Sequence, residues 1–323
     1  MSSITSSWDA ATADELAALD ALGAGGKWEL GGRVISLSNL DKVFSRATER
    51  SAPVTKRDLV RYAAQIAPTI GPYLAGRPLN VNRLPNGVES KGFWQKAVPS
   101  HAPDWLQRWR YVSSREHETE WYVVPDGAPA LAWMANSGVV ELHAWTSTAA
   151  SQDEPTYALI DIDPGDRTTF EEIVLLAHLY EVALRQLELI AAPKVTGKRG
   201  VQIWVPIRPG YTFHDTTAWV EKLSRTVGRV VPDLISWSWR KGDRGGKARL
   251  DYTQNSINKT LVAPYSPRAA LGLPVSVPIT WEELHDPALR PDRWVLASVI
   301  DRVRAVGDPF AVVLGVEQDL PAL

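Results

Sequence analysis

An α+β fold is predicted for this chain of 323 residues by three features of its sequence. Apolar segments rich in β-branched residues alternate with segments of helical spacing, and no repeated unit is present. Hydrophobic residues make up 45% of the chain and charged residues 22%, which is typical of a globular protein. No apolar run reaches the length of a membrane span. A chain of this length can bury one large core or two smaller ones.

The first half is predicted to mix helices and strands. Thr12 and Glu15 form a capping-box pattern for a helix over residues 12–23. A hairpin is expected over 27–37, around the turn Gly31-Gly32. The other elements expected in this half are a helix opened by Thr55 and Asp58, strands over 78–84 and 93–97, a helix over 127–137 and a strand over 139–145.

The second half is predicted to run strand, helix, strand, strand, helix, strand, strand. These elements are expected at 157–163, 168–189, 193–196, 201–206, 214–230, 248–251 and 260–263. This order resembles a ferredoxin-like or RNA-recognition-type sheet with helices on one face. From Trp281 onward we expect helical turns on the outside.

The most informative stretch is 157–165, a buried strand that ends in two carboxylates. Asp161 and Asp163 stand at i and i+2, so they point to the same face, roughly 7 Å apart along the strand. Two such acids on a buried strand are costly unless a cation lies between them. A divalent ion such as Mg²⁺ or Mn²⁺ would suit their oxygens. The alternative is a solvated strand end, and Asp-x-Asp also occurs in glycosyltransferases and calcium loops.

Asp251 is a third candidate acid, at the end of the short strand expected over 248–251. It could approach the first pair across the sheet. Three acids from neighbouring strands are what a two-metal phosphoryl-transfer site requires. The alternative is an ordinary acid at a strand end.

A basic turn, 197–200, joins two of the predicted strands. Its backbone N–H groups, with Lys198 and Arg199, could hold an anion. In that interpretation the turn cradles a triphosphate, and Thr196 and Gln202 donate hydrogen bonds. The alternative is an ordinary basic hairpin turn.

Other candidates are weaker when taken singly. His143 lies in an apolar strand, where a core histidine is the common case and a sugar or phosphate contact is the alternative. Phe93 and Trp94 precede a lysine and could stack on bases, although core packing explains at least one of them. Lys42 and Lys56 would be solvated lysines by themselves.

Composition excludes several kinds of site. The chain has no cysteine, which excludes disulfides, iron–sulfur clusters and cysteine-ligated zinc. Its six histidines are scattered, so we expect no histidine-rich zinc site. The net charge of −2 argues against a protein that coats nucleic acid along its whole surface, but it allows a local basic groove. Residues 1–11 lack a secretory signal pattern, so a cytoplasmic location is expected.

Several short motifs follow one another along the chain in a specific order. They are Asn39-Leu40-Asp41-Lys42, Gly76-Arg77-Pro78, Pro85-Asn86-Gly87, Phe93-Trp94-Gln95-Lys96, Ala102-Pro103-Asp104-Trp105, Glu141-Leu142-His143, Asp161-Ile162-Asp163-Pro164-Gly165, Thr196-Gly197-Lys198-Arg199-Gly200, Asp251-Tyr252-Thr253-Gln254-Asn255 and Ala263-Pro264-Tyr265-Ser266-Pro267-Arg268. Together they resemble the polymerase domain of bacterial ligase D, in the archaeo-eukaryotic primase superfamily. The resemblance runs from about residue 27 to 300.

The resemblance implies a primase-polymerase core of two mixed β-sheets flanked by helices, with an RRM-like C-terminal half. It divides one compact domain into a helical extension (1–26), an α/β subdomain with 5′-phosphate and template contacts (27–150), and a catalytic subdomain with C-terminal helices (151–323). No ligase or nuclease module is recognised. We therefore expect a stand-alone primase-polymerase, most similar to the mycobacterial forms that partner ligase C.

The activity that the resemblance implies is template-directed nucleotide addition at a primer 3′-end, with ribonucleotides preferred, at short gaps that carry a 5′-phosphate. Asp161, Asp163 and Asp251 would hold two ions, Mn²⁺ or Mg²⁺. The residues that would bind the nucleoside triphosphate are His143, Thr196, Lys198, Arg199, Gln202, Ser266 and Arg268.

The residues that would contact DNA are Asn39, Lys42, Lys56, Arg83, Phe93, Trp94 and Arg244. Within this set, Lys42 and Lys56 match a pocket for the downstream 5′-phosphate. Phe93 and Trp94 match an aromatic pair that stacks on the template, and Arg244 matches a residue that orients the primer terminus.

Three positions depart from the family pattern. Thr196 stands where the family usually has Ser, and Gln202 stands where it has His. Thr keeps the hydroxyl, whereas Gln is a neutral donor that cannot carry a positive charge. We expect either a lower affinity for the triphosphate or a compensating contact from Lys198 and Arg199. Asn82 also stands where a basic residue is common.

The resemblance implies gapped or end-joined duplex DNA and NTP or dNTP as binding partners, and it suggests an ATP-dependent DNA ligase (ligase C or D) and Ku as protein partners. No membrane partner is expected, and the protein would act at the bacterial nucleoid. Two alternatives stay open: a catalytically weak DNA-binding scaffold of the same fold, and a nucleotide-sugar transferase that uses Asp-x-Asp.

Overall fold

The computed structural model describes residues 7–112, 119–259 and 261–323, which form two compact units. The first unit comprises Met1–Ala144, Val262–Val275 and Trp294–Ala305. The second comprises Trp145–Leu261, Ser276–Arg293 and Val306–Leu323. Helices and sheets occur in both, so the predicted α+β class is confirmed. Among the described residues, no helix combines the length and the hydropathy that a membrane span requires.

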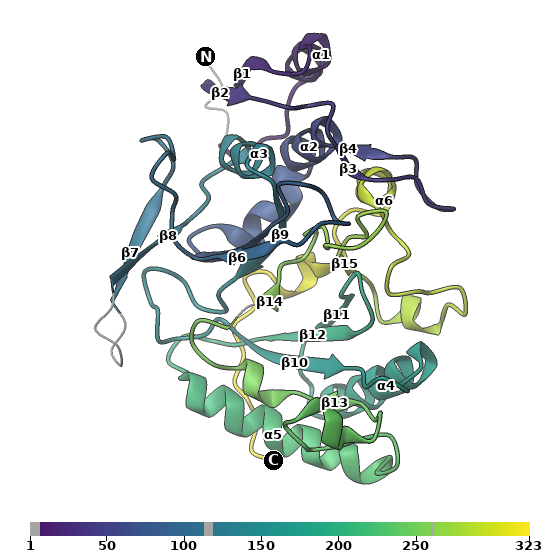
Figure 1. Cartoon of the computed structure of the whole chain (residues 1–323). Helices are drawn as coiled ribbons and strands as arrows, with labels where there is room; N and C mark the ends of the chain where they lie inside the picture. The colour runs from purple at the N-terminus through teal and green to yellow at the C-terminus, as the bar shows by residue number, and fades with distance from the viewer. Residues whose placement is uncertain (1–6, 113–118, 260) are drawn as a thin grey trace. The chain divides into compact units, whose positions relative to one another are not determined.

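The first unit is built on a four-stranded sheet of order β14-β9-β5-β6. Its strands are β5 (Leu79–Arg83), β6 (Phe93–Gln95), β9 (Val139–Ala144) and β14 (Leu261–Val262). Helices α2 (Lys56–Leu74) and α3 (Ala128–Asn136) pack against each other and contact β9 (Figure 1). The helices at 55 and 127 and the strands at 78, 93 and 139 were predicted, and they are confirmed.

Strand register gives this sheet one polar face. Asn80 stands opposite His143, and Asn82 stands between Glu141 on β9 and Trp94 on β6. Because side chains alternate along a strand, these five residues share a face. The apolar residues between them face the other way, toward α2. The sheet therefore presents polar and aromatic groups on the side away from its helices.

The remaining elements of the first unit are smaller. They are α1 (Ala13–Ala21), β1 (Gly26–Leu30), β2 (Arg33–Leu37), β3 (Val43–Ser45), β4 (Val54–Thr55), β7 (Arg108–Val112), β8 (Thr119–Val123) and α6 (Leu296–Val306). The capping box of Thr12 and the β1–β2 hairpin confirm their predictions. The β7–β8 pair was not predicted. In β7, arginines alternate with Trp109 and Tyr111, which are only partly buried, so no apolar run marks this strand. The apolar run over 121–124, which includes the buried end of β8, was overlooked.

The second unit is built on a five-stranded antiparallel sheet of order β13-β10-β12-β11-β15. Its strands are β10 (Tyr157–Asp163), β11 (Ala192–Val195), β12 (Val201–Pro206), β13 (Arg249–Leu250) and β15 (Val277–Pro278). Helices α4 (Phe170–Gln186) and α5 (Phe213–Val230) lie side by side on one face of it (Figure 1).

The succession of strands and helices predicted over 157–263 is present, but its last strand, β14, joins the sheet of the first unit beside β9. Strand β15 was not predicted, since two residues beside proline carry no strand signal. The likeness to an RNA-recognition fold stays a prediction. Four 3₁₀ helices complete the described chain, namely η1 (Lys241–Arg244), η2 (Tyr252–Gln254), η3 (Glu282–His285) and η4 (Pro309–Val313).

Candidate active site

The three predicted acids meet at the end of β10. Strand β13 pairs antiparallel with β10, and Arg249 stands opposite Asp163. The backbone N–H of Asp251 then donates to the carbonyl oxygen of Asp161 at 2.8 Å, so Asp251 lies opposite Asp161. Asp161 and Asp163 share a face of β10 because they are two residues apart. The structure therefore brings all three carboxylates to one point of the second unit.

Two segments approach the end of β10 closely, beside the three acids. A Cβ on Gly200, in the basic turn, would lie 2.7 Å from the carbonyl oxygen of Ile162 on β10. A Cβ on Gly165 would collide with the carbonyl oxygens of Gly246 and Lys247. Only glycine allows the basic turn, 197–200, and the charged loop over 240–247 to pack this tightly against the end of β10.

Asp161 is the most perturbed of the three acids. Its pKa is raised to about 7, chiefly by burial, against a hydrogen bond from Gln202 Nε2 to its Oδ1 at 3.0 Å that lowers it. The negative charges of Asp163 and Asp251 also contribute to the raised pKa, whereas the positive charge of Lys194 opposes it. Burial and the neighbouring carboxylates therefore favour a proton, or a metal ion, on Asp161 near neutral pH.

Asp251 has the opposite balance. Burial alone would raise its pKa, but hydrogen bonds from Thr253 and Gln254 and the charge of Arg249 outweigh burial and lower it. Thr253 Oγ1 donates to Oδ1 at 2.6 Å, and Gln254 Nε2 donates to Oδ2 at 3.0 Å. Arg249 Nη2 lies 3.2 Å from Oδ1. This acid is held ionised and fixed in orientation.

Asp163 is paired with Arg244, the residue that was expected to orient a primer terminus. Arg244 Nη1 lies 2.8 Å from Asp163 Oδ2. The same guanidinium donates to the carbonyl oxygens of Ser238 and Trp239, each at 3.2 Å. A cation that binds Asp163 would therefore compete with Arg244.

The donor set fits a divalent metal ion. All three acids offer carboxylate oxygens, the ligands that Mg²⁺ and Mn²⁺ prefer. Gln202 Oε1 is buried beside them and has no hydrogen-bond partner among the residues that the structure describes. A buried oxygen without a partner is rare unless water or an ion satisfies it. Asp161, Asp163 and Asp251 would hold the metal.

The basic turn is ordered by its own hydrogen bonds. Thr196 N donates to Gly200 O at 3.0 Å, and Gly200 N donates to Thr196 Oγ1 at 3.1 Å. Lys198 and Arg199 are exposed, and Arg199 Nη2 donates to the carbonyl oxygen of Gly165 at 2.6 Å. The turn thus presents two cations beside the acids.

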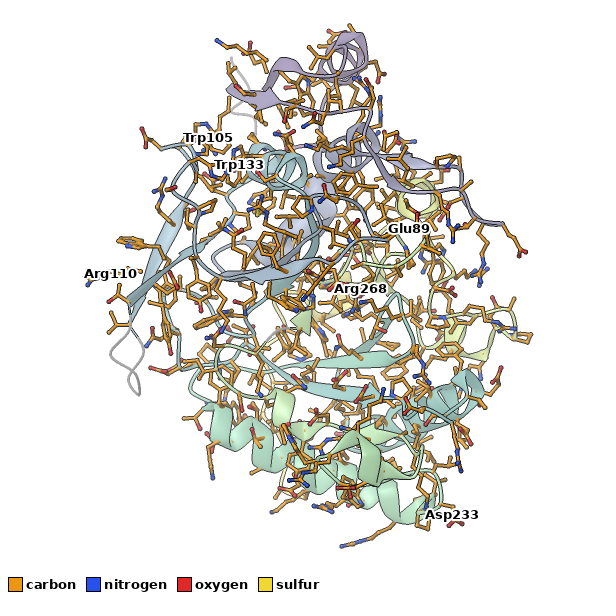
Figure 2. The ribbon with its side chains drawn as sticks, viewed as in Figure 1. Glu89, Trp105, Arg110, Trp133, Asp233 and Arg268 are labelled. Atoms are coloured by element: carbon orange, nitrogen blue, oxygen red, sulfur yellow. The ribbon has the colours of Figure 1, made fainter. Side chains whose placement is uncertain are left out.

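Glu141 organises predicted nucleotide-binding residues of the first unit. Its Oε1 accepts from Arg268 Nε at 3.1 Å and from Ala269 N at 2.9 Å, while its Oε2 lies 3.1 Å from His143 Nε2 (Arg268 is labelled in Figure 2). Because a carboxylate only accepts, His143 Nε2 carries the proton of this bond. The Trp94 ring stands edge-on to His143, with 4.7 Å between ring centroids.

The hydroxyl of Ser266 has a structural role that the sequence did not predict. Its hydroxyl is fully buried, accepts from Leu142 N at 2.8 Å and donates to the carbonyl oxygen of Pro267 at 3.0 Å. These bonds tie the segment to β9, so a direct nucleotide contact by Ser266 gains no support.

The first unit also gathers three cations. Burial lowers the pKa of Lys56, and the positive charges of Lys42 and Arg83 lower it further. Burial also lowers the pKa of Arg83. The ion pairs found among the described residues include none of the three. Such a cluster of cations favours the binding of an anion.

Neutral groups hold these cations in place. Lys56 Nζ donates to the carbonyl oxygen of Asn136 at 2.8 Å, and Lys42 Nζ donates to Asn86 Oδ1 at 2.7 Å. Asn39 adopts a left-handed backbone (φ 52°), and its carbonyl oxygen accepts from Lys42 N at 3.1 Å. Asn39 therefore shapes the turn that carries Lys42.

Phe93 and Trp94 are both exposed, at 48% and 51%. The guanidinium of Arg83 lies 5.4 Å from the centre of the Phe93 ring. The exposure of both aromatic side chains favours base stacking over core packing. The contact with Arg83 places Phe93 beside the three cations.

Two residues that shape these sites had no predicted role. Lys194 is fully buried on β11, opposite Gln202, and its Nζ donates to Ser276 Oγ at 2.7 Å. The sequence could have revealed this role, because a lysine inside an apolar strand requires a polar or acidic neighbour. Glu141, also a charged residue inside an apolar strand, could have been recognised in the same way.

These features define a metal-dependent nucleotidyltransferase. The chain belongs to the family of LigD primase-polymerase domains, whose family model matches residues 55–310. LigD polymerase domains are nucleotidyltransferases of the archaeo-eukaryotic primase superfamily, so the expected family is confirmed.

Curated relatives and one solved structure support this assignment. The multifunctional non-homologous end joining protein LigD of Mycolicibacterium smegmatis is 32% identical over 281 residues, which is 86% of this chain but 36% of that protein. The bifunctional LigD of Bacillus subtilis is 29% identical over 85% of this chain and 43% of its own length. The chain thus spans less than half of each.

One structural neighbour is the polymerase domain from Mycobacterium tuberculosis ligase D, solved in complex with DNA. It is 29% identical, with a TM-score of 0.78, and the match covers 88% of this chain and 99% of that domain.

The raised pKa of Asp161 predicts how stability depends on pH in the metal-free protein. The unfolded chain releases this proton near pH 4, whereas the folded chain holds it to about pH 7. The ionisation of Asp161 therefore lowers the free energy of unfolding as pH rises from 4 to 7, and the loss stays constant above that range. We expect Asp161→Asn, which cannot ionise, to be more stable than wild type at pH 8 by on the order of 3 kcal/mol.

Thermal unfolding in a chelating buffer measures this difference, which should vanish near pH 4. Saturating Mn²⁺ should reverse its sign, because only the wild type keeps all three carboxylates. A variant that is less stable than wild type at pH 8 without metal would contradict the prediction.

Proposed function

We propose that this chain is a template-directed primase-polymerase. It adds nucleotides, ribonucleotides in preference, to a primer 3′-end and fills short gaps that carry a downstream 5′-phosphate. The observation that carries the proposal is the meeting of Asp161, Asp163 and Asp251 across one pair of strands. Its membership of the LigD primase-polymerase family supports the same activity and argues against a nucleotide-sugar transferase.

The three acids would hold two divalent ions, Mn²⁺ in preference to Mg²⁺, which supply positive charge to the attacking and leaving oxygens. The chain's own part is to orient the acids and to keep Asp251 ionised. Gln202 fixes Asp161, and Thr253 fixes Asp251. Arg244, once released from Asp163, is available to the primer terminus.

Basic side chains and His143 would bind the nucleotide, and one buried carboxylate would orient two of these residues. In the second unit, Lys198 and Arg199 are exposed and suit a triphosphate tail. In the first, Glu141 orients His143 and Arg268, which we assign to the ribose and to a phosphate.

DNA is the proposed macromolecular substrate. Lys42, Lys56 and Arg83 would bind the 5′-phosphate of the gap, and Phe93 and Trp94 would stack on the template. The solved relative in complex with DNA supports this choice. The end-joining names of the LigD relatives support a role in DNA repair. From the family resemblance alone we propose an ATP-dependent DNA ligase (ligase C or D) and Ku as partners, at the bacterial nucleoid.

The central test removes two of the acids. We expect Asp161→Ala combined with Asp163→Ala to reduce primer extension with Mn²⁺ by roughly 10³-fold or more, because no other group replaces their charge at the reacting phosphate. DNA affinity, measured by fluorescence anisotropy, should change less than about twofold, since the change leaves Lys42, Lys56, Phe93 and Trp94 intact. Asp166→Ala, at an exposed acid nearby, is the matched control. Extension that survives the double change would sink the proposal.

The phosphate pocket has its own test. We expect Lys42→Ala combined with Lys56→Ala to remove the preference for gaps with a 5′-phosphate, a loss of roughly tenfold in affinity for the phosphorylated gap alone. Lys27→Ala, an exposed lysine of the same unit, should leave the preference unchanged. Equal binding of phosphorylated and unphosphorylated gaps by the wild type would refute the pocket.

Glu141 should act as a positioning residue. We expect Glu141→Gln to raise KM for ribonucleotides by roughly tenfold while kcat changes little, because the amide cannot hold His143 and Arg268 as the carboxylate does. The KM for deoxyribonucleotides should rise less. Glu89→Gln, at an exposed ion pair, is the control. An equal loss for both sugars, or a loss in kcat alone, would contradict the assignment.

A further inference from the structure

A histidine and glutamate cluster lies on the second unit, made by α4 and η3. His178 and Glu181 are one turn apart on α4, so they share a face. His285 is the last residue of η3, and its ring stacks on that of His178 with 4.3 Å between centroids. One side-chain atom from each of the three lies within 4.8 Å of the others. The fold therefore gathers two of the six histidines that are scattered along the sequence.

The position of His285 is set by packing. Trp281 Nε1 donates to the carbonyl oxygen of Ala191 at 2.9 Å, and Leu284 is 2% exposed. Glu283 Oε2 accepts from Thr280 N at 2.9 Å, which closes the start of the helical turn. The imidazole is exposed at the end of this anchored turn, so its ring can rotate while its backbone stays beside α4.

The carboxylate of Glu181 is held in an orientation that suits a metal ligand. It is only 6% exposed, on the buried face of α4. Its Oε1 lies 2.7 Å from Arg185 Nη2, and its Oε2 lies 3.1 Å from His178 Nδ1. The second distance is close to the ~3.3 Å that separates two ligands of a tetrahedral zinc ion with bonds of about 2.0–2.1 Å. Arg185 would remain as an outer partner that orients the carboxylate.

We propose that His178, Glu181 and His285 form a zinc site, with water as the fourth ligand. Two imidazoles and one carboxylate suit Zn²⁺, whereas Mg²⁺ and Mn²⁺ prefer ligand sets made of oxygen. The site is separate from the carboxylates of Asp161, Asp163 and Asp251. Zinc there joins α4 to η3, which are far apart in sequence, and so stabilises the second unit. The inference stands independently of the polymerase activity.

Zinc titration of the full chain tests the site, by calorimetry and by thermal unfolding after treatment with a chelator. The titrated protein carries Asp161→Asn and Asp163→Asn, so that the acid site does not compete. We expect one Zn²⁺ per chain with a Kd of about 10 μM or tighter. Zinc at a hundredfold excess over Kd should raise the melting temperature by roughly 5 °C.

Variants in the same background locate the ion. His285→Ala, at an exposed side chain, should weaken zinc binding at least tenfold and remove the thermal shift, and Glu181→Gln should do the same while keeping the size of the side chain. His214→Ala, at an exposed histidine of α5, should change neither quantity. Absence of binding at 100 μM zinc, or binding that His285→Ala and Glu181→Gln leave intact, would overturn the proposal.

Discussion

The pairing of β13 with β10 is the constraint on which the candidate active site depends. The bond from Asp251 N to Asp161 O sets the register, and that register puts a third carboxylate beside two others. Three acids this close cannot all ionise at low energetic cost. The protein responds unevenly: Arg244 pairs with Asp163, Thr253 and its neighbours hold Asp251, and Asp161 keeps a pKa of about 7. A bound cation relieves the one charge that the protein leaves uncompensated.

Gln202 connects this constraint to a departure from the family pattern. Its amide donates to Asp161, so the residue acts on the acid as well as near the basic turn. A protonated histidine there would add a positive charge and lower the pKa of Asp161, whereas the amide offers only a hydrogen bond. The departure therefore bears on how readily Asp161 loses its proton, and the basic turn retains Lys198 and Arg199 for an anion.

The first unit contains the opposite imbalance. Lys56 is buried beside Lys42 and Arg83, and its pKa is lowered by burial and by their charges. Among the residues that the structure describes, the two lysines are held by neutral oxygens, of Asn136 and Asn86. The two units thus concentrate charge of opposite sign before any ligand arrives, which is the usual cost of a preorganised site.

Local signals in the sequence determined most elements, because caps and side-chain periodicity act within a few residues. The threonine caps at 12, 55 and 169, the shared face of Asp161 and Asp163, and the succession of helices and strands over 157–263 were predictable. Only the tertiary structure decided which distant groups meet: Asp251 with Asp161, Glu141 with Arg268, and His178 with His285. It also revealed that the hydroxyl of Ser266 serves the fold. Strand register and helix packing determine such contacts, and both depend on interactions between segments that no local pattern encodes.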